Sequence, residues 1–132
     1  MDSPKLYVVF YRPRYGNFQH WALYLDADDQ EVIFEVVGSH PNFRPNVVNS
    51  RPERSKNFIG KVLVAVLDKD DIRRVHEIVE NVKVYNDTVE WDCQEYVLDI
   101  LDSLEAEFIV EEDDEDYREA RKELKEKRGA MY

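Results

Sequence analysis

The chain has 132 residues, of which 43% are hydrophobic and 36% are charged, a composition that suits one folded domain and excludes a disordered chain or a two-domain enzyme. Its 18 basic and 29 acidic residues give a formal net charge of -11, which would repel nucleic acid and anionic lipid headgroups. The single cysteine, Cys93, cannot form an internal disulfide, and most zinc sites would want a second thiol. We therefore expect no nucleic-acid partner, and nothing in the sequence implies a metal or organic cofactor.

Membrane and secretion signals are not apparent. No window approaches the roughly 18 apolar residues that a membrane-spanning helix needs. The first residues, Met1-Asp2-Ser3-Pro4, do not have the basic and then apolar order of a secretion signal. We expect a soluble, cytoplasmic protein without integral membrane association.

The first half of the chain predicts strands. Residues Lys5 to Tyr11 are β-branched and aromatic, as strands prefer. Two further runs, Gln19 to Leu25 and Glu31 to Val37, are joined by a short polar stretch, which predicts an antiparallel hairpin. Residues Gly38 to Asn57 contain three prolines and are expected to form a long loop. The nearly continuous apolar run from Phe58 to Leu67 predicts a central strand that is covered on both faces.

Helices are predicted in the second half. Apolar residues share one stripe between Ile72 and Val82, with aspartates just before it, where a helix dipole favours negative charge. A second helix is expected to begin at Asp92, which has capping-box spacing to Glu95. Its apolar face is predicted to run from Cys93, which would face inward, to Phe108.

The composition changes at Glu111. From there to Arg128 the chain has nine acids and six bases, with acids crowded at Glu111 to Asp116 and most bases gathered later, an order that suits a helix dipole. We therefore expect a domain of residues 1–110 followed by a charged C-terminal helix or tail at 111–132. Its buried face would consist only of Tyr117, Ala120 and Leu124, which predicts weak packing and leaves its charged surface for a possible protein partner.

Cys93 and His20 are the candidates for nucleophilic chemistry. In the first turn of a helix, a thiolate is stabilised by unpaired backbone N–H groups and by the dipole. A cysteine nucleophile also needs a base, and His20 opens a predicted strand, where its side chain would be held rigidly. The alternatives are that Cys93 is a buried small hydrophobic residue and that His20 only packs against its neighbours.

Two short motifs surround these residues. The first is Phe10-Tyr11-Arg12-Pro13, then Tyr15, then His20-Trp21-Ala22-Leu23-Tyr24, and the second is Asp92-Cys93-Gln94-Glu95-Tyr96-Val97. Together they resemble the lecithin retinol acyltransferase-like branch of the NlpC/P60 superfamily, across most of residues 5–108. The resemblance implies an α+β fold, a small antiparallel sheet packed against helices in a circularly permuted papain-like arrangement. It also implies that Cys93 is the nucleophile, that His20 is its base and that Tyr24 matches the family's motif tyrosine.

The family places a second polar residue, usually histidine, on the next strand to orient the base. No histidine occupies that stretch here, but Glu35 is the only ionisable side chain between residues 32 and 37. A hairpin turn centred on residues 27 and 28 would set His20 opposite residue 35 or a near neighbour, where a carboxylate would fix the imidazole tautomer. The alternatives are that Glu35 faces outward and that His40, in the following loop, is the orienter.

The expected activity is cysteine-dependent acyl transfer: hydrolysis of an amide, peptide or thioester bond, or transfer of the acyl group. Backbone N–H groups at the start of the cysteine helix would receive the oxyanion, and the substrate-binding or oxyanion region is expected to include Trp21, Tyr24, Asp92 and Gln94. The family's asparagine before the cysteine is Asp92 here, and its charge would raise the pKa of the thiol. The alternative is a catalytically inactive interaction module that binds a protein or a small molecule.

Overall fold

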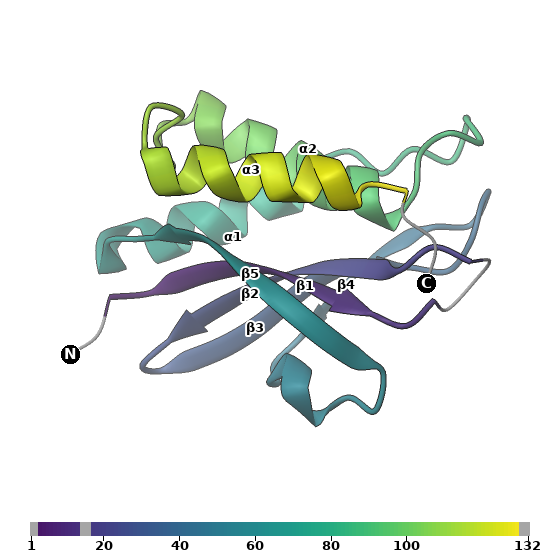
Figure 1. Cartoon of the computed structure of the whole chain (residues 1–132), viewed down its shortest axis with the longest axis horizontal. Coiled ribbons are helices and arrows are strands. Elements are labelled where there is room, and N and C mark those ends of the chain that lie inside the picture. Colours follow the sequence, from purple (N-terminus) through teal and green to yellow (C-terminus); the bar gives the residue numbers. More distant parts are fainter. Residues whose placement is uncertain (1–2, 14–16, 130–132) are drawn as a thin grey trace.

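The strands of the chain form an antiparallel sheet that carries all three α-helices on one face (Figure 1). The computed structural model describes residues 3–13 and 17–129. Within them the sheet order is β4-β3-β2-β1-β5, and every neighbouring pair is antiparallel. The strands are β1 (Lys5–Tyr11), β2 (His20–Ala27), β3 (Gln30–Val37), β4 (Arg44–Val48) and β5 (Phe58–Val66). The predicted α+β class with an antiparallel sheet is confirmed, whereas residues Arg14 to Gly16, including the motif residue Tyr15, lie outside the described part.

The central strand is β2. Residues Phe58 to Leu67 were predicted to form a central strand covered on both faces; the strand is confirmed as β5, but its central position is wrong. β5 lies at an edge of the sheet, and alternate side chains along it, including those of Ile59, Leu63 and Val66, are exposed. A run of apolar residues indicates a strand, but its place in the sheet depends on pairing partners that lie far away in the sequence. β2 is the strand that is buried on both faces over its first six residues.

The predicted long loop also contains regular structure. Residues Arg44–Val48 form β4, and Pro52–Arg54 form a short 3-10 helix. β4 is the other edge strand, so Pro45 faces no partner on its open side and costs the sheet no central hydrogen bond. In the pairing of β4 with β3, Asn46 lies opposite Glu35.

The β2–β3 hairpin turns one residue later than predicted. Ala27 pairs with Gln30, so the turn consists of Asp28 and Asp29. This moves each cross-strand partner by two residues, as in the pairing of Leu23 with Phe34. Because side chains alternate with a period of two, the shift leaves every residue on its predicted face.

The helices are α1 (Ile72–Asn81), which follows a 3-10 turn at Lys69–Asp71, α2 (Cys93–Ala106) and α3 (Glu115–Lys127). The main core lies between them and the sheet, with fully buried side chains that include Trp21, Leu23, Tyr96, Ile100 and Leu104. Phe108 was predicted to belong to the apolar face of α2, and this prediction is wrong. Phe108 adopts a φ of 59° beyond the helix end, and 87% of its surface is exposed.

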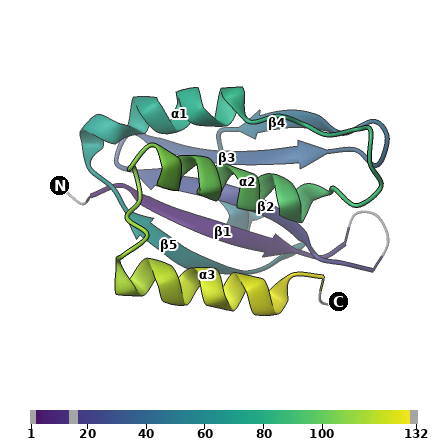
Figure 2. The same cartoon turned by 90° about the horizontal axis from the view of Figure 1, so that it is seen from above.

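The charged C-terminal segment forms part of the helical layer. α3 runs beside β5 on the same side of the sheet as α2 (Figure 2). Its predicted apolar residues Tyr117, Ala120 and Leu124 are all buried in the main core. Arg121 also donates to Asp102 on α2 at 3.0 Å. No helix in the described part of the chain has the length and apolar character that a membrane crossing requires.

Candidate active site

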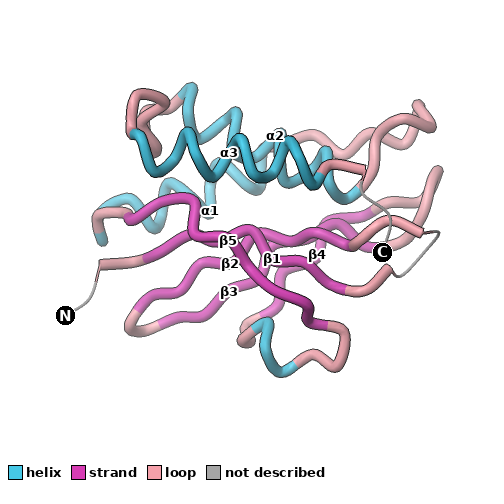
Figure 3. The backbone as a smooth tube through the Cα atoms, viewed as in Figure 1, coloured by secondary structure: helices cyan, strands magenta, loops and turns pink. Residues whose placement is uncertain are grey.

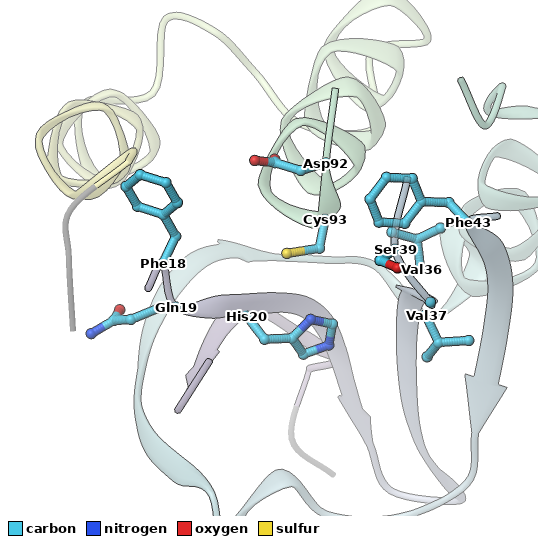
Figure 4. A pocket seen from close by; sticks show the side chains of 10 residues that line it. Phe18, Gln19, His20, Val36, Val37, Ser39, Phe43, Asp92 and Cys93 are labelled. Carbon is cyan, nitrogen blue, oxygen red and sulfur yellow. The ribbon is translucent and has the colours of Figure 1, made fainter. Parts of the chain in front are cut away.

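The β3–β4 loop and the start of α2 lie at the same end of the sheet (Figure 3). Residues from both, together with residues at the start of β2 and the end of β3, line a pocket. Its cavity measures about 100 Å³. Figure 4 shows the side chains of His20, from β2, and Cys93, from α2, at this pocket. The two motif residues, which lie far apart in the sequence, therefore line one cavity. The other lining residues are Phe18, Gln19, Val36, Val37, Gly38, Ser39, Phe43 and Asp92.

His20 belongs to a buried chain of hydrogen bonds. Its side chain is 5% exposed, and its Nε2 lies 2.8 Å from Oε1 of Glu35, which is also buried. Asn46 Nδ2 donates to the other carboxylate oxygen, Oε2, at 2.9 Å. The ring of Tyr11 lies beside the imidazole, with 5.6 Å between the ring centres. His20 and Glu35 are therefore fixed by β1, β3 and β4 together.

The strand register explains why His20 meets Glu35. Continuing the pairing of Leu23 with Phe34 by one step places Ala22 opposite Glu35. His20 lies two residues earlier on the same face, so it contacts Glu35 as a diagonal neighbour. The hairpin was expected to set His20 opposite residue 35 or a near neighbour, and in the observed register Glu35 lies within hydrogen-bond distance of His20.

Cys93 occupies the first position of α2 and is partly buried. Burial raises the pKa of its thiol to about 11, and the neighbouring charge of Asp92 acts in the same direction. Hydrogen bonds from the backbone N–H groups of Trp21 and Gln94 oppose this shift, as does the charge of Arg128. The thiol is therefore protonated at neutral pH, and the helix start does not by itself produce a thiolate.

Asp92 is the N-cap of α2. Its Oδ1 accepts hydrogen bonds from the backbone N–H groups of Gln94 at 3.0 Å and Glu95 at 3.2 Å. Arg128, just beyond α3, forms an ion pair with the same oxygen at 3.3 Å. Two of the backbone N–H groups at the start of the cysteine helix, those of Gln94 and Glu95, are therefore already bonded to the Asp92 carboxylate.

Gln94 ties three parts of the molecule together. Its side chain is 1% exposed, and its Nε2 donates to the backbone carbonyl of Gln19 at 2.9 Å. Its Oε1 accepts from Arg128 Nη1 at 2.7 Å and from the backbone N–H of Gly129 at 2.9 Å. Gln94 thus fixes the start of the cysteine helix against the segment that leads into His20 and against the end of α3.

Other candidate residues lie elsewhere. The side chain of Trp21 packs on Phe10 in the main core, and only its backbone reaches Cys93. Tyr24 donates its hydroxyl to Glu31 at 3.0 Å and does not line the pocket. His40, the alternative orienter, is exposed and also lies outside the pocket lining.

Two contributors were missed by sequence reasoning. Asn46 lies in the segment that was predicted as loop, although the two β-branched valines that follow it could have indicated an edge strand. Arg128 reaches the first turn of α2 from the end of α3, about 35 residues later in the chain, and no local pattern signals such a contact. Among the residues that the structure describes, no cluster of three or more histidine, cysteine or acidic side chains could hold a metal ion.

The fold and the site define an α+β domain with a cysteine at a helix start and a buried histidine–glutamate pair beside it. Residues 6–111 match DUF6540, a family of unknown function. The chain belongs to this family. No curated protein and no solved structure gives a significant match.

Proposed function

We propose that the protein is a cysteine-dependent acyl-transfer enzyme, with Cys93 as the nucleophile, His20 as its base and Glu35 as the residue that orients the base. The observation that carries this proposal is the buried hydrogen bond of 2.8 Å between His20 and Glu35, in a pocket that Cys93 also lines. A buried carboxylate against a histidine that shares a pocket with a thiol is the arrangement that nucleophilic catalysis requires. The reaction class is hydrolysis of an amide, peptide or thioester, or transfer of its acyl group.

The first step would form an acyl-enzyme. The Cys93 sulfur attacks the carbonyl carbon, and the thiol proton passes to His20. Because Nε2 of His20 is bonded to Glu35, the proton goes to Nδ1. The imidazolium then protonates the leaving group as the carbonyl re-forms, and a thioester remains on Cys93. In the second step, water or an acceptor attacks the thioester, His20 removes its proton, and the thiol is released.

The raised pKa of Cys93 makes the base essential. With a pKa of about 11 the thiol carries its proton into the reaction, so transfer to His20 must accompany attack. The negative charge of Glu35 stabilises the imidazolium that results. Since Asp92 accepts from the backbone of Gln94 and Glu95, the N–H of Cys93 itself would receive the oxyanion.

The circularly permuted papain-like arrangement is part of the same proposal. It is supported by the order of the parts, because the histidine strand β2 precedes the cysteine helix α2 in the chain. It is also supported by the packing of that helix on an antiparallel sheet, with the cysteine at the helix start.

Labelling with a cysteine-directed acyloxymethyl ketone tests the function. Cys93 is the single cysteine of the chain, so every thiol adduct reports on this site. We expect the folded wild-type protein to be labelled faster than the same protein in denaturant, because only the folded site aligns His20 with the thiol. Cys93→Ala should give no labelling. Equal or faster labelling of the unfolded protein would contradict the proposal.

A second candidate is a catalytically inactive module that uses the same pocket to bind a partner. The observation that favours it is the pKa of Cys93, which burial and Asp92 raise and which a reactive thiol would need lowered. In this case His20 and Glu35 would only stabilise the fold, and the labelling experiment would show the unfolded protein to be the more reactive form.

A further inference from the structure

The pocket beside Cys93 has apolar walls. Phe18 lies on one side of it, at the entry to β2, and Val36 and Val37 come from the end of β3 (Figure 4). Phe43 closes the side formed by the β3–β4 loop. Pockets that bind ligands combine such walls with a few polar groups that orient the reacting part, here His20 and the thiol.

The Phe43 wall is held rigidly. The Asn86 side chain bonds both backbone polar groups of Phe43: its Oδ1 accepts from the Phe43 N–H at 2.7 Å, and its Nδ2 donates to the Phe43 carbonyl at 3.0 Å. The Phe43 ring meets Trp91 edge-on, with 5.6 Å between the ring centres. Trp91 in turn donates to Asp99 at 2.9 Å. A wall fixed from both its backbone and its ring limits the size of what can enter.

Gly38 allows the loop to turn back toward the pocket. It has a φ of 93°, and a Cβ at this position would lie 2.7 Å from the backbone oxygen of Asn42. A larger residue would therefore push the segment before Phe43 away from β3. The conformation of the β3–β4 connection therefore helps to keep the cavity small.

The charges at the pocket disfavour an anionic ligand. Asp92 is part of the lining, and no lysine or arginine is among the described lining residues. Arg128, which pairs with Asp92 at 3.3 Å, is also paired with Glu95 at 2.9 Å. A carboxylate or phosphate on the bound group would face the aspartate without a compensating charge.

We infer that the group bound in this pocket is an uncharged, apolar acyl chain or side chain of about six carbon atoms or fewer. The limit on its size follows from the volume of the cavity, which is about 100 Å³. For comparison, an apolar cavity of about 150 Å³ accommodates benzene, which has six carbons. The inference rests on the proposed function for the statement that the bound group is the acyl part of a substrate. It goes further by naming the size and charge of that group, with Phe43 as the residue that limits its length.

Binding to the Cys93→Ala variant tests the inference without requiring any reaction. Hexanamide and adipamate have the same chain length, but adipamate ends in a carboxylate. In NMR titrations we expect hexanamide to shift the amide signals of Gly38 and Ser39 and to bind at least about tenfold more tightly than adipamate. Dodecanamide should bind no more tightly than hexanamide. Equal or tighter binding of adipamate, or a clear preference for dodecanamide, would overturn the inference.

Turnover of nitrophenyl esters with acyl chains from acetyl to dodecanoyl tests the role of Phe43. We expect the wild-type enzyme to prefer chains of up to about six carbons, and Phe43→Ala to move the optimum to longer chains. Phe108→Ala is the matched control, because Phe108 is 87% exposed and does not line the pocket. An unchanged optimum in Phe43→Ala would overturn its assignment. Selective hexanamide binding without any turnover would instead overturn the proposed function and support the assigned ligand class.

Discussion

The buried carboxylate of Glu35 connects two side chains of the candidate site: one oxygen bonds the imidazole of His20 and the other accepts from the amide of Asn46. The contact between His20 and Glu35 could be anticipated because a hairpin constrains which residues share a face, even when its turn is misplaced by one residue. Asn46 could not be anticipated, because its bond to Glu35 depends on an edge strand in a proline-containing segment. Cys93 was correctly placed at a helix start, but its raised pKa depends on how deeply the tertiary structure buries it.

The charge of Asp92 should slow the reaction of Cys93 with iodoacetamide. With a pKa of about 11, the thiolate fraction of the wild-type protein rises about tenfold per pH unit between neutral pH and pH 10, and the rate should follow it. Asp92→Asn keeps an N-capping side chain but removes the charge, which lowers the pKa. We expect the variant to react several-fold faster at about pH 8.

Asp102→Asn is the control for this measurement, since Asp102 lies on the same helix but pairs with Arg121. It should leave the rate unchanged. A wild-type rate that levels off near the free-thiol pKa of about 8.5 would show that burial does not control this cysteine.

Glu35→Gln should lower kcat/KM by about tenfold or more, because the amide cannot stabilise the imidazolium of His20. The acid limb of the pH–rate profile should also move to lower pH, since the neutral imidazole persists there once the carboxylate is lost. Glu31→Gln, on the same strand but bonded to Tyr24, is the control and should leave the profile unchanged. A loss of rate with no movement of the acid limb would indicate a purely structural role for Glu35.

Strands and helices whose apolar residues repeat with a clear period could be predicted from the sequence. The strands and helices that each of them packs against could not. β5 reads as a buried strand because its apolar residues are nearly continuous, yet it forms an edge with alternate side chains exposed. α3 has three apolar residues among many charges, and its packing depends on contacts with β5 and α2, which lie earlier in the chain. Local patterns carry no information about such long-range partners.

Leu124→Ala should destabilise the whole domain. Leu124 is fully buried in the main core, so its truncation should cost about 2–5 kcal/mol, measured as the free energy of unfolding in urea. Leu63→Ala, on the exposed side of β5, should cost far less and serves as the control. Equal small effects would mean that α3 is a loosely attached tail.

At the scale of the whole molecule, the fold gathers residues from distant parts of an acidic chain at one end of the sheet. His20 comes from β2, Glu35 from β3 and Cys93 from α2, while Arg128 holds the start of α2 from the end of α3. The family match ends at residue 111, so α3 and Arg128 lie beyond the part that defines the family. The central claim is that these parts form an acyl-transfer site in which His20 activates Cys93.

Intact-mass measurement of the acyl-enzyme during reaction with nitrophenyl hexanoate tests this claim most directly. We expect one hexanoyl adduct on the wild-type protein and none on Cys93→Ala. We also expect that His20→Gln slows adduct formation by about 10²- to 10⁴-fold, while His76→Gln, which alters a histidine bonded to Gln30 away from the pocket, leaves the rate unchanged. Failure to form the adduct, or formation at the same rate in His20→Gln, would contradict the account.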